Sequence, residues 1–144
     1  MPTIWTIGYE QTTMSAFLAA LQEAGVELVA DVRAIAASRR PGFAKNALAA
    51  NLAEAGIAYR HFRALGTPPE GRAAARALNL PKLKQVYAGQ LELPEAIAAG
   101  AELAELAHQR RVALLCYERE PACCHRTLLR KAVLADCEVV DLFP

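Results

Sequence analysis

The sequence predicts an α/β fold, a three-layer sandwich in which helices cover both faces of a mainly parallel sheet of about five strands. Short apolar runs of strand length alternate along the chain with longer stretches that carry apolar residues at helical spacing. The apolar runs are continuous, which is typical of strands buried on both faces. A length of 144 residues is that of one domain, so residues 1–144 are expected to form a single α/β domain.

The first part of the chain predicts three strands and two helices. Residues 3–9 (TIWTIGY) form a β-rich run, and a helix is expected over residues 14–25, with a threonine before it as cap and a glycine at its end. A buried strand is expected over residues 26–33 (VELVADVR). A second helix over residues 46–56, which also ends on glycine, precedes a third strand over residues 57–62.

The second part of the chain is less regular at first. Residues 63–93 contain three prolines and leave room for two short helices. Residues 94–110 have the apolar spacing of a helix, and residues 111–118 (RVALLCYE) predict a fourth strand. A helix with proline near its first position is expected over residues 121–136, followed by a last strand over residues 137–143.

Composition excludes a membrane-spanning protein. The chain is 54% hydrophobic, but no stretch approaches the roughly 18 apolar residues of a membrane helix. The N-terminus lacks the basic flank of a secretory signal, so we expect a cytoplasmic protein with reduced thiols. The thiols in question are those of Cys116, Cys123, Cys124 and Cys137.

Charge is unevenly distributed although the net charge is only +1. Residues 32–91 contain ten basic and two acidic side chains, a local charge of +8, whereas residues 92–105 contain four acids and no base. This asymmetry predicts an anionic partner on one face, either a small molecule or nucleotide or, as a second possibility, nucleic acid.

Chemically capable residues follow the ends of the predicted strands. Ligands of open parallel sheets bind beyond the carboxyl ends of the strands, so these residues are expected to share one site. They are Tyr9, Asp31, Arg33, His61, Cys116, Glu118, Cys124, His125 and Arg126.

One candidate chemistry is anion binding. Arg33, Arg39, Arg40 and Arg126 would hold the anion, aided by the free N–H groups at the start of the helix that contains Cys124. The alternative is that Arg33 and Arg126 only pair with Asp31 and Glu118. The sequence contains neither of the usual glycine-rich nucleotide-binding motifs.

A second candidate chemistry is nucleophilic or acid–base catalysis. Placed in the first helical turn beside His125 and Arg126, Cys124 is expected to have a lowered pKa, and Cys116 is a second candidate nucleophile. Glu118 and His61 are candidates for general acid–base work.

A metal site is the third possibility. Cys116, Cys124, His125 and His61 have the side chains that bind zinc. However, the spacing C-x7-C-H matches no common structural site, and neighbouring residues of a helix point in different directions. We therefore predict no metal ligand, and the sequence indicates no particular cofactor.

The motifs TIGYE, DVR, SRRPGF and LLCYEREPACCHR occur in this order. In this they resemble the family called "domain of unknown function 488". The resemblance spans almost the whole chain and implies a Rossmann-like α/β fold, but it brings no established reaction. Within the last motif, the family pattern includes Cys124 and not Cys123.

Together these features predict a small cytoplasmic enzyme that binds a phosphate-bearing or nucleotide-like anion at the strand ends. A non-catalytic module that binds nucleic acid or protein is an alternative, and a thiol-based redox or transfer protein that uses Cys124 is another.

Overall fold

A five-stranded sheet forms the centre of the computed structural model, which describes residues 2–144. The order of the strands is β3-β2-β4-β1-β5, and every pairing is parallel. This confirms the predicted sheet and shows it to be parallel throughout. The strands are β1 (Thr3–Gly8), β2 (Leu28–Asp31), β3 (Ala58–His61), β4 (Val112–Cys116) and β5 (Glu138–Leu142).

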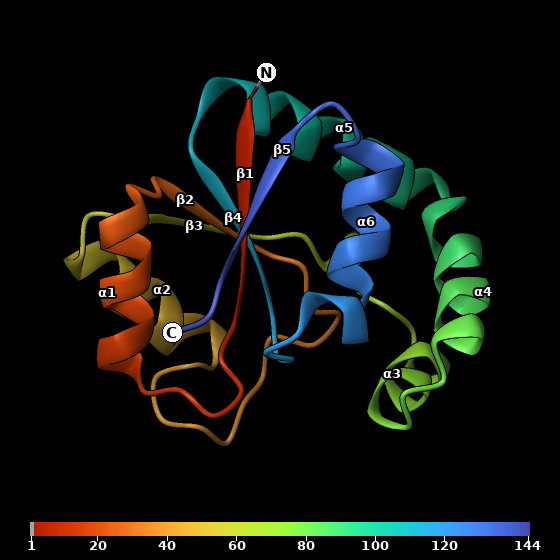
Figure 1. The fold of residues 1–144 in the computed structure, drawn as a ribbon, viewed down its shortest axis with the longest axis horizontal. Coiled ribbons are helices and arrows are strands. Elements are labelled where there is room, and N and C mark those ends of the chain that lie inside the picture. Colours follow the sequence, from red (N-terminus) through yellow and green to blue (C-terminus); the bar gives the residue numbers. More distant parts are fainter. Residues whose placement is uncertain (1) are drawn as a thin grey trace.

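Helices cover both faces of the sheet, as predicted. Figure 1 shows α1 and α2 on one side and α4 and α6 on the other, with α5 packed into the same core as α6. In residues 2–144, no helix is both long and apolar enough to cross a membrane. The helices are α1 (Met14–Ala24), α2 (Lys45–Glu54), α3 (Pro69–Arg76), α4 (Leu80–Leu91), α5 (Pro94–Gln109) and α6 (His125–Val133).

Local signals explain where the helices begin and end. The side chain of Thr13 caps α1 by accepting a hydrogen bond from the amide of Ala16, and Gly25 ends the helix in the left-handed conformation. The last predicted helix begins later than expected. Residues Pro121–Cys123 form a separate 3-10 helix, so Cys124 precedes α6 as its N-cap instead of lying inside its first turn.

Side chains along the inner strands alternate between two cores. Ile4, Leu28 and Val112 point to the core under α5 and α6, whereas their neighbours Trp5, Val29 and Ala113 point to the core under α1 and α2. Both sets are buried, which accounts for the continuous apolar runs in the sequence.

The carboxyl ends of β1 and β4 lie side by side at a topological switch point. The connection from β1 runs through α1 towards β2, whereas the connection from β4 runs through α6 on the opposite face towards β5. Ligands of open α/β sheets bind at such points. The two loops that leave the switch point are joined, because the amides of Tyr9 and Glu10 both donate to the carbonyl of Tyr117.

Gly8 allows this close approach of the two loops. A Cβ atom at position 8 would lie 1.9 Å from the carbonyl oxygen of Glu118, far inside van der Waals contact. The obstacle is backbone, so the second loop would have to move.

We expect Gly8→Ala to lower the free energy of unfolding by about 1–3 kcal/mol through overpacking. The matched control is Gly89→Ala, where an added Cβ meets no heavy atom within 4 Å. Gly89 lies within α4, where replacing glycine by alanine is expected to raise the free energy of unfolding by about 0.5–1 kcal/mol. Urea unfolding gives the free energy of unfolding of both variants. Equal values would contradict the close approach of Gly8 to the backbone of Glu118.

Candidate functional site

A cavity of about 450 Å³ opens at the carboxyl ends of β1, β2 and β4. Its wall is formed by the loops after these three strands, by helix α3 and the residues that flank it, and by the segment that leads into α6. This volume is ordinary for a small-molecule site. The lining residues are Tyr9, Glu10, Arg33, Ala34, Ile35, Thr67, Arg72, Ala75, Arg76, Leu78, Cys116, Tyr117, Glu118, Glu120, Cys123 and His125.

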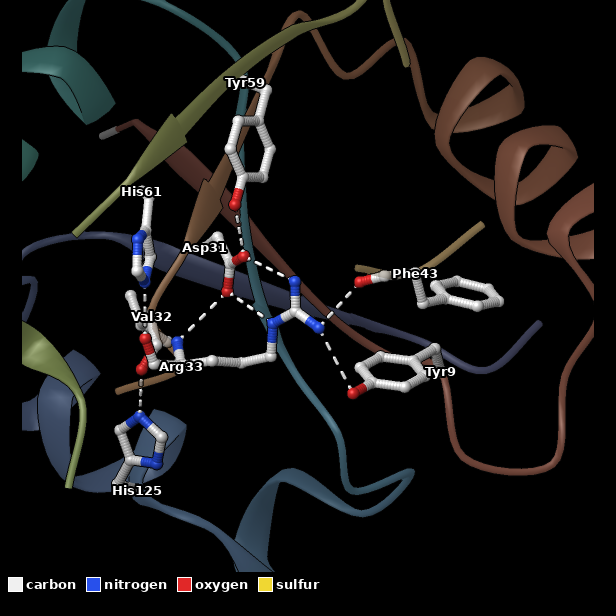
Figure 2. Close-up of polar contacts among 8 residues, drawn as sticks. All are labelled: Tyr9, Asp31, Val32, Arg33, Phe43, Tyr59, His61 and His125. Carbon is white, nitrogen blue, oxygen red and sulfur yellow. Dashed lines mark hydrogen bonds and ion pairs between the residues drawn. The ribbon is translucent and has the colours of Figure 1, made fainter. Parts of the chain in front are cut away.

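A buried ion pair between Asp31 and Arg33 supports one wall of the cavity (Figure 2). Arg33 donates to the two carboxylate oxygens of Asp31 from Nε at 2.9 Å and from Nη2 at 2.7 Å. Its Nη1 donates to the hydroxyl of Tyr9 and to the carbonyl of Phe43. Asp31 also accepts from the hydroxyl of Tyr59 at 2.5 Å. The pair thus connects β2, β3 and the loops that contain Tyr9 and Phe43.

The ion pair affects the pKa of Arg33 itself and the pKa of neighbouring Tyr59. Burial alone would lower the pKa of Arg33, but the hydrogen bond and negative charge of Asp31 outweigh it and raise that pKa above its ordinary value. Burial raises the pKa of Tyr59, and Asp31 raises it further. Both groups therefore keep their protons, and Arg33 stays charged.

Two histidines fix the backbone that follows β2. His125 Nε2 lies 2.6 Å from the carbonyl oxygen of Val32, and His61 Nε2 lies 2.7 Å from that of Arg33 (Figure 2). A carbonyl oxygen only accepts, so each Nε2 carries the hydrogen. In the neutral imidazole of His125, Nδ1 is then an unprotonated acceptor.

That acceptor faces a thiol. His125 Nδ1 lies 3.8 Å from Cys116 Sγ, and both residues are buried and line the cavity. The ring of Tyr87 packs edge-on against the imidazole, with its centroid 5.1 Å away, and holds it in place. A thiol, an acceptor nitrogen and a carbonyl that orients the ring are the parts of an activated cysteine nucleophile.

The surroundings of Cys124 differ from those expected from the sequence. Its sulfur accepts hydrogen bonds from the amide of Arg126 at 3.3 Å and from Nε of Arg126 at 3.0 Å. Burial raises the pKa of Cys124, and neighbouring Cys116 raises it further, although Arg126 and His125 act in the opposite direction. The expected lowered pKa is therefore wrong, because desolvation outweighs the adjacent positive charges.

The structure separates the predicted site residues into two groups. Tyr9, Arg33, Cys116, Glu118 and His125 line the cavity. The other six lie outside its lining. Asp31, His61, Cys124 and Arg126 support it from behind, Arg40 donates to the carbonyls of Tyr9 and Thr12, and Arg39 is exposed.

Arg126 is fully buried, and most of its donors are used inside the protein. Besides the bonds to Cys124, its Nη2 donates to the carbonyl of Glu118, so it binds the backbone of that residue and not its carboxylate. Nη1 of Arg126 and Oε2 of Glu118 are buried without a hydrogen-bond partner in the part of the chain that the structure describes.

Sequence reasoning missed the contribution of α3. Arg72 and Arg76 lie one helical turn apart and both line the cavity, and Arg72 also donates to the carbonyl of Thr67 at 3.0 Å. The available signal was the spacing of four residues between the two arginines, after the helix start at Pro68–Pro69. Residues 63–93 look irregular overall, so this spacing alone did not place the two arginines at the site.

We expect Asp31→Asn to lower the free energy of unfolding by about 3–5 kcal/mol, because it leaves the charge of Arg33 buried without its partner. Tyr59→Phe removes one hydrogen bond to the same carboxylate and should cost only about 1–3 kcal/mol. Chemical denaturation of the two variants compares them. Losses of equal size would contradict the central role of the ion pair.

Comparison with known proteins agrees with the resemblance seen in the motifs. A family model described as "Domain of unknown function DUF488" matches residues 13–133, which include every predicted site residue except Tyr9. No curated protein and no solved structure matches the chain. The match covers most of the chain, and the protein belongs to the DUF488 family.

Proposed function

We propose that this protein is a small cytoplasmic enzyme that uses Cys116 as a nucleophile on an anionic small molecule. The observation that carries the proposal is the 3.8 Å contact between Cys116 Sγ and Nδ1 of His125, whose other ring nitrogen lies against the carbonyl of Val32. Cys116 replaces Cys124 as the preferred nucleophile because it lines the cavity, whereas Cys124 is buried behind it.

In the proposed step, the proton of Cys116 moves to Nδ1 of His125, and the resulting thiolate attacks an electrophilic atom of the substrate. The carbonyl of Val32 holds Nε2–H and so stabilises the imidazolium that forms. His125 can later return the proton to a leaving group. Glu118, which also lines the cavity, is a second group able to accept a proton there.

The cavity wall favours a substrate with an apolar body and a negative group. Ile35 and Leu78 line the cavity and are 59% and 66% exposed, so they offer apolar surface to the body of a bound molecule. Arg72 and Arg76 lie on one side, on α3, and would face a phosphate or carboxylate. This supports a phosphate-bearing or nucleotide-like compound.

A small molecule fits the charges better than a nucleic-acid strand does. Several basic side chains of residues 32–91 are already bound within the protein, which reduces the positive surface available to a long polyanion. Arg33 pairs with Asp31, Arg60 pairs with Glu102, and Arg40 binds two backbone carbonyls.

We expect Cys116 to react with iodoacetamide faster than an ordinary cysteine at pH 7. An ordinary thiol is about 3% thiolate at this pH, so complete proton transfer to His125 raises the rate by about 30-fold at most. His125→Gln keeps a side chain of similar size but removes the proton acceptor, and should lower the rate by about tenfold or more. Mass spectrometry of the alkylated sites gives both rates, with Cys124, which lies outside the cavity lining, as the slow internal reference. Equal rates in the two proteins would refute the dyad.

The second test compares iodoacetate with iodoacetamide, which share a leaving group but differ in charge. If α3 binds the anion, Arg72→Gln and Arg76→Gln each lower the preference of Cys116 for iodoacetate by about two- to fivefold. Arg39→Gln is the matched control, because it removes the same charge from an exposed position outside the cavity lining. An equal effect of all three variants would show only a general change in net charge.

A further inference from the structure

Cys116, Cys124 and His125 form a compact cluster of buried metal-binding side chains. The two sulfurs and a ring nitrogen all lie within 4.8 Å of one another. The three side chains are between 2% and 7% exposed. Thiolate and imidazole are ligands that Zn²⁺ and other soft or borderline metals prefer.

The backbone at Cys124 explains how two residues adjacent in sequence converge. Cys124 is the N-cap of α6, with φ −141° and ψ 178°, and is therefore extended and not helical. This removes one of the two arguments against a metal site, the one that placed both residues inside a helical turn, while the uncommon spacing C-x7-C-H remains. His61, the fourth residue considered there, is outside the cluster and holds the carbonyl of Arg33.

The cluster is slightly wider than a tetrahedral site. With a Zn–S bond of about 2.3 Å and a Zn–N bond of about 2.0 Å, a sulfur and a nitrogen ligand lie about 3.5 Å apart and two sulfurs about 3.8 Å apart. Cys116 Sγ and His125 Nδ1 are separated by 3.8 Å, and no two of the three ligand atoms are more than 4.8 Å apart. The side chains would therefore have to close by about 1 Å or less around one ion.

Groups around the cluster already orient the ligand atoms. A metal-binding histidine usually donates its other ring N–H to a carbonyl or carboxylate, and the carbonyl of Val32 has that position against Nε2. The amide and Nε of Arg126 point at the sulfur of Cys124 and would stabilise it as a thiolate. These contacts leave Nδ1 of His125 available towards the two sulfurs.

We propose that Cys116, Cys124 and His125 bind a thiophilic divalent cation such as Zn²⁺, with the fourth position open to the cavity that Cys116 and His125 line. Binding replaces the two thiol protons, so two protons leave as one dication enters and the net charge of the cluster is unchanged. The ion takes the same lone pairs that the proposed nucleophile uses. The metal-bound protein is therefore the form in which Cys116 does not react as a free thiol.

The test is titration of the reduced, metal-free, full-length protein with Co²⁺ and with Zn²⁺. We expect one equivalent of either metal to release two protons from the metal-free protein, and Co²⁺ to give thiolate-to-cobalt charge-transfer absorption and the intense visible bands of a tetrahedral site. One equivalent of Zn²⁺ should then displace the bound Co²⁺ and abolish these bands without further proton release. Cys116→Ser and Cys124→Ser should each weaken binding by more than about 100-fold. Cys137→Ser is the matched control and should bind as the wild type does, because this residue lies outside both the cluster and the cavity lining.

Absence of these cobalt bands in the wild-type protein would overturn the proposal, and so would their loss in Cys137→Ser. If Cys124→Ser does not fold, the proton count and the protection of Cys116 from iodoacetamide by one equivalent of Zn²⁺ still decide the question on the wild-type protein. Fewer than two protons, or no protection, counts against the site. Alkylation of the metal-free protein tests the nucleophile separately, so failure of one proposal leaves the other standing.

Discussion

The ion pair between Asp31 and Arg33 is the contact on which the candidate site depends. Removing two charges from water costs several kcal/mol per ion, and only close geometry with further hydrogen bonds offsets that cost. Here the carboxylate accepts from three donors of Arg33, its amide, Nε and Nη2, and from the hydroxyl of Tyr59. The remaining guanidinium bonds reach Tyr9 and the carbonyl of Phe43. Because the two charged residues flank Val32, the pair fixes the backbone whose carbonyl orients His125.

Successive side chains of a strand point to opposite faces of the sheet, so the two faces carry different polar groups at the site. Val29 of β2 faces the core under α1 and α2, so Asp31 points to that side, where Tyr59 meets it. In β4, Leu114 faces the opposite core, and Cys116 therefore points towards α6 and His125. The structural carboxylate and the thiol of the proposed nucleophile are thus kept on opposite faces. A shift of either strand by one residue would separate each group from its partner.

The sequence was sufficient for the fold, because the fold follows from patterns that are local, and five of the eleven residues predicted for the site line one cavity. Continuous apolar runs indicated strands buried on both faces, and their polar ends identified one edge of the sheet. It was not sufficient for the state of Cys124. The sequence shows the positive neighbours His125 and Arg126 but not the burial that raises the pKa of this thiol. It also failed to identify Arg72 and Arg76, because their contribution to the cavity depends on how α3 packs at a distance from the strand ends.

The same geometry makes the proposed catalysis and the proposed metal binding competing properties of one cluster. Since the carbonyl of Val32 takes the Nε2 hydrogen, the Nδ1 lone pair of His125 faces Cys116. A proton shared between Nδ1 and Cys116 yields the nucleophile, whereas a cation needs that lone pair together with both deprotonated sulfurs. Metal binding releases protons, so higher pH favours the metal form. Cys124 belongs to the proposed metal cluster but does not line the cavity, so it would take part in metal binding without contacting a substrate there.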